Sequence, residues 1–362
     1  MQRNIERMQS RMNELGVAFR PHVKTTKCIE ITQLQVDAGA RGITVSTLKE
    51  AEQFFAVGIT DILYAVGMAA PKLKQAAALI AKGCRLKIVA DSEAAAQAIV
   101  EYSREYGVAF EVWIEVDTDN HRSGVKPHSD ELLRIGRLLH GGAGSIKLGG
   151  VMTHAGSSYE LSSPEALQAM AEQERSLCVL AAQRLRETGM PCPIVSVGST
   201  PTALSATQLQ GVSEVRAGVY VMQDLVMANV GVCSLSEIAL SVLTTVIGHQ
   251  IDKGWAIVDA GWMAMSRDRG TASQANNYGY GQVCDALGQP IEDYVMSSAN
   301  QEHGILSRAG DAPDPDIVQR FPIGSQLRIL PNHACATGAQ FPEYQAVIGD
   351  QVQATWPRFY GW

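Results

Sequence analysis

The chain has 362 residues, of which 46% are hydrophobic and 19% are charged, and its formal net charge at pH 7 is -7. This composition is typical of a globular protein with a large core, and the length favours two domains over one. The negative charge argues against nucleic acid or an anionic membrane as the main partner, because both attract clustered Lys and Arg.

Cysteine usage and hydropathy indicate the compartment. Seven cysteines lie scattered between Cys28 and Cys335 without the spacing of a disulfide framework, so we expect a reducing compartment, the cytoplasm. No apolar run approaches the roughly 20 residues that span a bilayer, and the first residues lack the apolar stretch of a signal peptide. We therefore expect a soluble protein.

The first fifteen residues predict a helix. Four apolar residues recur there at helical spacing among charges of both signs: Ile5, Met8, Met12 and Leu15. No capping residue precedes this helix, and a barrel normally opens with a strand, so we expect a longer natural N-terminus.

From residue 17 to residue 220, short β-branched runs alternate with longer amphipathic stretches. This alternation predicts βα units around a parallel sheet. The predicted strands are 17–23, 42–46, 61–65, 86–90, 110–116, 148–153, 194–197 and 214–217, with helices that include 26–38, 71–82 and 164–188. Eight strands predict a closed (β/α)8 barrel, whose active site lies at the carboxyl ends of the strands.

After residue 232 the pattern changes to strand-like runs without long helices. These runs are 238–249, 255–258, 294–298, 326–329, 344–347 and 352–356. Segments 261–282 and 307–322 are rich in turn residues and predict loops. We therefore predict an α/β protein with an eight-stranded parallel barrel domain over residues 1–232 and a C-terminal all-β domain over residues 233–362.

The first predicted strand ends in Arg-Pro-His-Val-Lys24-Thr, which puts a lysine at the mouth of the barrel. We interpret Lys24 as a candidate Schiff-base lysine. Burial against the barrel walls would lower the pKa of its ammonium and free the amine to attack an aldehyde. The position of Lys24 alone also fits a solvated lysine that precedes a helix and has no catalytic role.

Turns after the last two strands predict an anion site. The residues that form these turns are Gly198, Ser199, Thr200, Gly218, Val219 and Tyr220. Glycine lets the backbone approach an anion, while hydroxyl and N–H groups donate to it. Either turn alone is weak evidence, but the loops after strands seven and eight are the usual phosphate site of such barrels.

Two more residues follow strands of the predicted barrel. His154 comes after the sixth strand and is a candidate to stack on or orient an aromatic cofactor, while Arg122 comes after the fifth and is a candidate donor to a ring oxygen or nitrogen. The alternatives are a capping histidine and a surface arginine.

The motif Asn-His333-Ala-Cys335 follows a predicted strand of the second domain. In an extended segment, side chains two residues apart point to the same side, so an imidazole and a thiol can bind one ion, and the thiolate favours zinc. The pair is not specific by itself. With only two ligands, the coordination shell is completed either by other residues or by water and substrate, and the second arrangement suits a catalytic metal.

Two polar clusters in the same domain have alternative interpretations. Glu302 or His303 could support a metal or substrate, and Arg267 and Arg269 could bind a substrate carboxylate through paired hydrogen bonds. All four could equally form ordinary loop salt bridges. Three aromatic residues are expected to pack rather than act: Trp262, Tyr278 and Tyr280.

Together these residues resemble the D-serine dehydratase-like and D-threonine aldolase-like proteins, which share the fold type of alanine racemase. The resemblance spans nearly the whole chain. Its motifs are Arg-Pro-His-Val-Lys24-Thr, His154-Ala-Gly-Ser-Ser, Val-Gly198-Ser-Thr, Arg216-Ala-Gly218-Val-Tyr, Gln301-Glu-His-Gly and His333-Ala-Cys335.

The resemblance implies pyridoxal 5'-phosphate on Lys24, with Thr47 near the ring and the two turns near the phosphate. It also implies a divalent metal on His333 and Cys335, with zinc expected and manganese, cobalt or magnesium as alternatives. Met227 falls where aldolase relatives offer a tyrosine to the cofactor, so that contact is not expected. By analogy with the fold type, we expect a homodimer.

The activity implied is that of a dehydratase, which converts a 3-hydroxy D-amino acid to a 2-keto acid and ammonia. D-threo-3-hydroxyaspartate, D-serine and D-threonine are the candidate substrates. Lys24 would remove the α-proton, and the metal would assist departure of the hydroxyl. In the aldolase branch the second metal ligand is typically aspartate, so Cys335 favours the dehydratase.

Three rival functions remain. An aldolase would instead give glycine, or glyoxylate, and an aldehyde from the same site. An amino-acid racemase shares the barrel but has no use for the metal pair, and a cofactor-carrying binding protein would not need it either.

Overall fold

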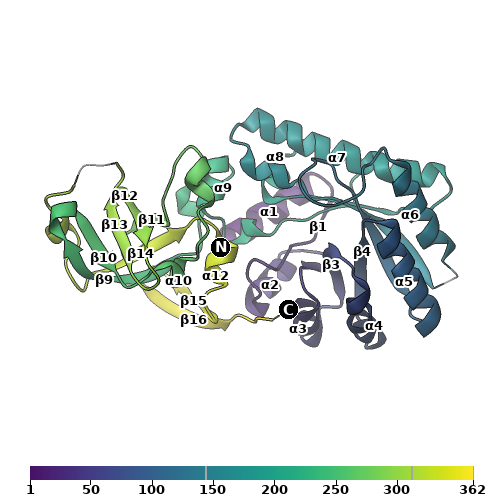
Figure 1. The fold of residues 1–362 in the computed structure, drawn as a ribbon, viewed down its shortest axis with the longest axis horizontal. Helices are drawn as coiled ribbons and strands as arrows, with labels where there is room; N and C mark the ends of the chain where they lie inside the picture. Colours follow the sequence, from purple (N-terminus) through teal and green to yellow (C-terminus); the bar gives the residue numbers. More distant parts are fainter. Residues whose placement is uncertain (143–144, 311–312, 362) are drawn as a thin grey trace. The chain divides into compact units, whose positions relative to one another are not determined.

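The computed structural model describes residues 1–142, 145–310 and 313–361 (Figure 1). The chain forms two compact units. One consists of Ile5–Gly218 and Phe359–Trp362, and we call it the barrel unit; the other consists of Met1–Asn4 and Val219–Arg358, and we call it the C-terminal unit. The first four residues of the chain therefore belong to the C-terminal unit, and the residues from Phe359 onward belong to the barrel unit.

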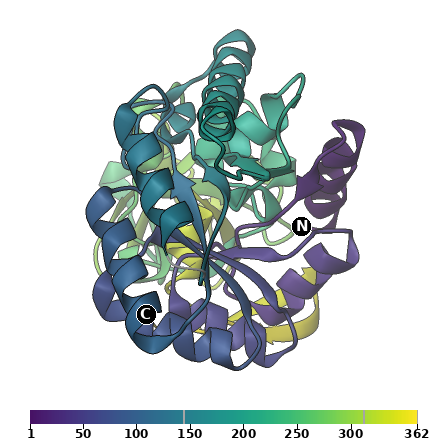
Figure 2. The same ribbon diagram turned by 90° about the vertical axis from the view of Figure 1, so that its right-hand side faces the viewer.

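The barrel unit is a parallel sheet surrounded by helices (Figure 2). Its strands are β1 (Ala18–Phe19), β2 (Ile43–Val45), β3 (Asp61–Gly67), β4 (Arg85–Ala90), β5 (Phe110–Glu115), β6 (Ile146–Met152), β7 (Ile194–Val197) and β8 (Glu214–Val215), in the order β1-β8-β7-β6-β5-β4-β3-β2. Thr44 donates its N–H to Pro21 and accepts from Val23 N–H, so the chain after β1 bonds to β2 and the ends of the sheet meet. The predicted eight-stranded parallel barrel is confirmed.

Sequence signals mark the ends of the helices. The Ser163 hydroxyl accepts a hydrogen bond from Ala166 N–H at 3.2 Å and caps α7, while Gly107 ends α5 with a left-handed φ of 67°. The helices of the chain up to β8 are α1 (Gln2–Glu14), α2 (Ile29–Asp37), α3 (Leu48–Ala56), α4 (Leu73–Ala81), α5 (Glu93–Tyr106), α6 (Asp130–Gly141), α7 (Pro164–Glu187) and α8 (Thr200–Ser205). Across the described ranges, every helix is too short or too polar to cross a membrane.

The first strand is shorter than the predicted 17–23. Arg20 N–H donates to Val215 O and His22 N–H to Ala217 O, so pairing with β8 continues past Phe19. Pro21 between them has no N–H to donate, which interrupts the regular ladder. The backbone nevertheless remains close to β8 as far as the lysine turn.

A buried ion-pair network joins the chain after β1 to β8 and to β3. The guanidinium of Arg20, on the chain after β1, donates through Nε to Glu214 on β8 at 2.9 Å and through Nη1 to Asp61 on β3 at 2.6 Å. Lys87 on β4 also donates to Asp61. Burial disfavours the ionised carboxyl of Asp61, yet Arg20 and Lys87 outweigh this and lower its pKa.

The same chain of hydrogen bonds continues toward the carboxyl ends of the strands. The hydroxyl of Ser196 on β7 donates to Glu214 at 2.7 Å. Arg216, which is fully buried, donates to the Ser196 hydroxyl and to the carbonyl of Thr153. A polar layer therefore crosses the barrel interior, and each buried charge in it has a partner, as burial requires.

The C-terminal unit contains a closed antiparallel β-barrel in the order β10-β13-β12-β11-β14-β9 and a separate hairpin, β15-β16. Its elements are α9 (Leu225–Val230), β9 (Val242–Gln250), β10 (Trp255–Val258), α10 (Trp262–Met265), β11 (Gly281–Cys284), β12 (Pro290–Ala299), β13 (Gly304–Arg308), α11 (Ile317–Arg320), β14 (Gln326–Pro331), α12 (Ala334–Gly338), β15 (Glu343–Ile348) and β16 (Gln351–Pro357). Val246, Val258, Val283, Met296 and Leu306 form part of its buried core. The predicted all-β character is confirmed.

Both predicted loops of this unit contain structure that the sequence did not predict. Segment 261–282 includes α10 and the start of β11, and segment 307–322 includes α11, while residues 311–312 lie outside the described residues. Gly281 opens β11 where an added Cβ would lie 2.4 Å from Leu330 O, so close strand packing requires glycine. Glycine and turn residues at such approaches make a strand resemble a loop.

Replacing Arg20 by Ala should lower the free energy of unfolding by about 3–5 kcal/mol, because Glu214 and Asp61 would be left buried without their cation. Urea denaturation measures this change. Arg85→Ala is a matched control, since Arg85 pairs with the same Asp61 at 3.7 Å from an exposed position. Its loss should stay below about 1 kcal/mol. Equal losses in the two variants would contradict a special role for the buried pair.

Candidate functional site

Lys24 lies in the turn that follows β1. Its neighbours Val23 and Thr25 are buried, whereas Lys24 is exposed. The expected burial of Lys24 against the barrel walls is therefore wrong for this chain. The backbone N–H of Val23 donates to Thr44 O at 2.9 Å, so the residue before Lys24 is held against the chain of β2.

Two histidines close to Lys24 are held neutral. Burial lowers the pKa of His22 well below 6.5, and the charges of Lys24 and Arg216 lower it further. Burial also lowers the pKa of His154 to about 3, with added contributions from the same two cations and from Arg122. The barrel unit thus gathers three cations around two neutral imidazoles.

The ring of His154 has a defined tautomer. Its Nδ1 lies 3.0 Å from Gly198 O, and because a carbonyl only accepts, Nδ1 carries the proton. A neutral ring then leaves a lone pair on Nε2. The ring of Tyr159 lies 6.0 Å away, centroid to centroid. His154 therefore presents an acceptor rather than a charge.

This cluster fits an anionic cofactor. Pyridoxal phosphate carries its negative charge on the phosphate and the ring oxygen, and Lys24, Arg122 and Arg216 supply positive charge. The buried Nδ1 of His22 has no hydrogen-bond partner among the residues that the structure describes, so it remains available to a bound group. On charge and on hydrogen-bonding capacity, the residues present suit such a molecule.

A buried carboxylate on α7 holds two of the loops together. Oε1 of Glu174 accepts hydrogen bonds from Ala155 N–H at 2.9 Å and from Gly198 N–H at 3.0 Å. Burial raises the pKa of Glu174. Since Ala155 directly follows His154 and Gly198 directly precedes Ser199, one side chain fixes the loops after β6 and β7.

The hydroxyl turn after β7 is tightly packed. The Ser199 hydroxyl caps α8 by accepting from Thr202 N–H at 3.2 Å and lies 2.8 Å from the Ser158 hydroxyl. Gly198 has a φ of 130°, and an added Cβ there would lie 2.2 Å from Arg216 O, so no other residue fits. Ser199 and its neighbour Thr200 are both buried.

Two other predicted residues lie at the ends of strands. Thr47 follows β2 and caps α3, where its hydroxyl accepts from Glu50 N–H at 3.0 Å. Gly218 follows β8, and an added Cβ would lie 3.1 Å from His22 O and 3.2 Å from the Thr25 hydroxyl. The barrel unit therefore brings the end of β8 against the lysine turn.

Other predicted residues have less specific surroundings. Arg122 is exposed in the loop between β5 and α6. Val219 and Tyr220 belong to the C-terminal unit, where both are buried in a short 3-10 turn. Met227 is buried in α9.

His333 and Cys335 lie at the start of α12 in the C-terminal unit. His333 is the N-terminal cap with an extended backbone (φ -137°), but Cys335 lies in the first helical turn. The expected extended segment is therefore wrong, because the helix begins directly after His333, where Asp224 accepts from Ala334 N–H at 2.9 Å. The imidazole and thiol still come within hydrogen-bonding reach of each other.

The surroundings of His333 are acidic. Burial disfavours its imidazolium, but hydrogen bonds to Asp268 and Cys335 outweigh this and raise the pKa of His333 to about 11. Burial raises the pKa of Asp224 to about 6. In the described part of the chain, no three His, Cys, Asp or Glu side chains are arranged to hold a metal ion together. Imidazole and thiol fit a metal as two donors, which leaves other coordination positions to water or substrate.

The two other polar clusters predicted from the sequence also belong to the C-terminal unit. The Arg267 guanidinium stacks 4.5 Å from the Trp262 ring centroid, and that of Arg269 lies 5.3 Å from the Tyr280 ring centroid. These rings pack as expected, and Tyr278 packs against the buried Leu330. Glu302 and His303 are exposed between β12 and β13.

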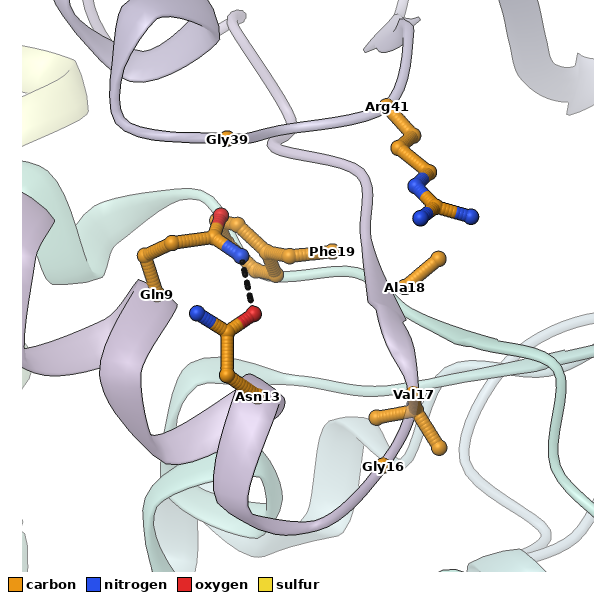
Figure 3. A pocket seen from close by; sticks show the side chains of 8 residues that line it. All are labelled: Gln9, Asn13, Gly16, Val17, Ala18, Phe19, Gly39 and Arg41. Atoms are coloured by element: carbon orange, nitrogen blue, oxygen red, sulfur yellow. Dashed lines mark hydrogen bonds between the residues drawn. The ribbon is translucent and has the colours of Figure 1, made fainter.

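A cavity of about 320 Å³ lies at the other end of the barrel (Figure 3). It is lined by Gln9, Asn13, Gly16, Val17, Ala18, Phe19, Gly39 and Arg41. On the wall that α1 contributes, Gln9 Nε2 donates to Asn13 Oδ1 at 2.9 Å. These residues precede or open β1 and β2, whereas Lys24 follows β1, so the cavity is separate from the candidate site.

Some residues of the site were not predicted from the sequence. Glu174 lies on the buried face of α7, between the apolar residues Ala171 and Cys178. A carboxylate on such an apolar face is unusual, and this was a signal that could have identified it. His22 and Lys24 are two residues apart, which was a second usable signal. Glu115 ends β5, where burial raises its pKa and it accepts from the Ser123 hydroxyl at 3.1 Å. Nothing in its sequence context marks it.

Residues 1–225 match the family described as alanine racemase, N-terminal domain, and residues 239–347 match the putative serine dehydratase domain. The chain therefore belongs to the family of alanine racemase-fold enzymes that carry a serine dehydratase domain. The resemblance drawn from the sequence motifs is confirmed.

The chain is similar to individual proteins of known activity, to different degrees. The chain is 65% identical to D-threo-3-hydroxyaspartate dehydratase of Delftia sp. strain HT23 over 100% of this chain and 95% of that protein, and the solved structure of that enzyme matches with a TM-score of 0.98. It is 30% identical to D-serine dehydratase of Dictyostelium discoideum over 96% of this chain and 90% of that one. It is 28% identical to D-threonine aldolase of Arthrobacter sp. over 92% of this chain and 83% of that protein.

Two further solved structures are variants of D-threo-3-hydroxyaspartate dehydratase, each with a TM-score of 0.98 to this chain. In one a histidine is replaced by alanine, and in the other a cysteine two residues further along is replaced, in the metal-free form. The spacing equals that of His333 and Cys335.

Replacing Glu174 by Ala should lower the free energy of unfolding by more than about 2 kcal/mol, since two buried N–H groups lose their acceptor. Glu172→Ala is the control on the same helix, because Glu172 is half exposed and pairs with Arg175. Chemical denaturation of both variants measures the difference. A loss for Glu174→Ala no greater than for Glu172→Ala would contradict the inferred link between the loops.

The imidazole of His154 should titrate near pH 3 instead of near 6.5. The unfolded chain would take up this proton at higher pH than the folded chain, so His154 removes stability as pH falls from 6.5 toward 3, by up to about 1.4 kcal/mol per pH unit. Nitrogen-15 NMR of the protein without added cofactor follows the ring, with His154→Asn assigning the signal. Titration near pH 6.5 would contradict the neutral tautomer.

Proposed function

We propose that this protein is a pyridoxal-phosphate- and metal-dependent dehydratase that converts a 3-hydroxy D-amino acid to a 2-keto acid and ammonia. D-threo-3-hydroxyaspartate is the first candidate substrate, with D-serine and D-threonine as the others. The observation that carries this proposal is the 65% identity to D-threo-3-hydroxyaspartate dehydratase along the entire chain. The lyase class is common to the dehydratase and aldolase relatives.

In the barrel unit, Lys24 is proposed to hold the cofactor and then, through Nζ, to take the α-proton of the substrate. When bound, pyridoxal phosphate supplies an electron sink for the charge left at Cα. The residues proposed to surround it are Thr47, Arg122, His154, Ser199, Thr200, Gly218, Val219 and Tyr220. The neutral His154 can accept at Nε2, and Arg122 can offset the charge of the ring oxygen.

In the C-terminal unit, His333 and Cys335 are proposed to hold a divalent metal, with zinc favoured by the thiolate. The metal would supply a Lewis acid for departure of the β-hydroxyl. Support comes from the matching spacing of a histidine and a cysteine in variants of the Delftia enzyme, the cysteine variant being metal-free.

The second candidate function is an aldolase that yields glycine, or glyoxylate, and an aldehyde. It is favoured by the likeness to D-threonine aldolase, at 28% identity. The higher identity to dehydratases places it second. We further propose a homodimer, on the analogy of enzymes with this fold. The scattered cysteines support a cytoplasmic location.

The deciding experiment incubates the protein, supplied with pyridoxal phosphate and zinc, with each of the three D-amino acids separately. Ammonia and a keto acid are the expected products, and a chelator should abolish them. Glycine with an aldehyde would instead assign the aldolase, and a change of chirality alone would assign a racemase.

Two variants test the assigned roles. Lys24→Ala should lose the visible absorbance of lysine-bound pyridoxal phosphate together with activity, whereas Cys335→Ala should lose metal dependence or activity and keep that absorbance. Lys27→Ala is the control in the same turn region, because Lys27 is paired with Glu50 at 3.3 Å. Retained absorbance in Lys24→Ala would overturn the assignment of Lys24.

A further inference from the structure

Asp268 contacts the proposed metal ligand His333 directly. Oδ2 of Asp268 lies 2.7 Å from Nδ1 of His333, although the two residues are far apart in the sequence. At this distance the two side chains share a hydrogen bond, in which the carboxylate oxygen accepts and the ring nitrogen donates. An ionised carboxylate only accepts, so Nδ1 of His333 carries a proton and Nε2 is the nitrogen left for an ion.

We propose that Asp268 is a positioning residue for the metal: its carboxylate fixes the tautomer and orientation of the His333 ring so that Nε2 faces the ion beside the Cys335 thiolate. This inference rests on the proposed metal site. Carboxylate partners of metal-binding histidines in proteins orient the ring and raise its basicity, and their loss typically weakens metal affinity about 10- to 100-fold.

The hydrogen bonds around Asp268 favour this indirect role over direct coordination. Its Oδ2 is taken by His333, and its Oδ1 accepts from Gly270 N–H at 2.8 Å. The other nearby carboxylate, Asp224, accepts from Ala334 N–H at 2.9 Å and from Met227 N–H at 3.0 Å. Both carboxylates therefore support the backbone and the imidazole, and the imidazole and thiol remain as the donors.

The loop that carries Asp268 is anchored to the chain that carries His333. Asn332 directly precedes His333 and is buried. Its Nδ2 donates to Asp268 O at 3.1 Å and to Gly279 O at 2.8 Å, and its Oδ1 accepts from the Thr271 hydroxyl at 2.9 Å. One amide thus holds the backbone of Asp268 next to the end of β14. The carboxylate is consequently placed before any ion arrives, which is what preorganisation requires.

The test measures metal affinity, separately from activity, in wild-type protein and in Asp268→Ala and Asp268→Asn. Zinc affinity is obtained by competition with a chromophoric chelator, and cobalt(II) is added as a spectroscopic probe of ligand geometry. Asp268→Ala should bind zinc about 10- to 100-fold more weakly. Asp268→Asn should lose less, because an amide oxygen still accepts from Nδ1. In both variants the cobalt ligand-field bands should change while the thiolate charge-transfer band remains.

Asp252→Asn is the matched control, since it removes one carboxylate from an exposed position in the same unit. Its zinc affinity should equal that of the wild type. Circular dichroism of the metal-free proteins checks folding, and if Asp268→Ala fails to fold, the affinity and cobalt spectrum of Asp268→Asn decide.

The two ways of failing are distinguishable. Wild-type affinity and an unchanged cobalt spectrum in the Asp268 variants would overturn the positioning role and leave the metal site standing. Zinc binding that survives Cys335→Ala unchanged, or its absence from the wild type, would overturn the proposed metal site and this inference with it.

Discussion

The barrel depends on the pairing of Arg20 inside it. A guanidinium buried among strands is tolerated only with partners of opposite charge, and the partners of Arg20 are Glu214 on β8 and Asp61 on β3. The pairing ties the chain after β1 to β8 and to β3, at the place where Pro21 has no N–H to contribute. Through Ser196 the same network fixes Arg216, so the positive charge beneath the lysine turn is set by the interior of the fold.

Both candidate sites are built on the same principle. In each, a residue with chemical capacity lies on a loop, and a carboxylate from a distant part of the sequence holds that loop in place. Glu174 does this for the loops of His154 and Ser199, and Asp268 does it for the ring of His333. The reactive groups thus owe their orientation to residues that need not touch a substrate, and loops that would otherwise be mobile become rigid supports.

Much of this organisation could be predicted from the sequence, for identifiable reasons. The barrel was predictable because β-branched runs and amphipathic stretches alternate regularly, and Lys24, Ser199 and Gly218 could be placed because each follows a strand. The exposure of Lys24 and the helical position of Cys335 could not, since the residue before each bonds to a distant part of the chain, Val23 to Thr44 and Ala334 to Asp224. The roles of Glu174 and Asp268 could not be predicted, because their hydrogen-bond partners lie on other elements. Hydrogen bonds between elements leave no local pattern in the sequence.

The distribution of the chain ends between the two units bears on how such a protein can be divided or recombined. Asn4 donates to Val221 O at 3.2 Å and to Glu237 O at 2.8 Å, while Phe359 N–H donates to Lys27 O at 3.0 Å and its ring meets that of Phe54 edge-on. A cut between Gly218 and Val219 would therefore separate each half from a segment that completes it. An exchange of one unit between homologues would therefore have to include its terminal segment. The C-terminal unit needs residues 1–4, and the barrel unit needs the residues from Phe359 onward.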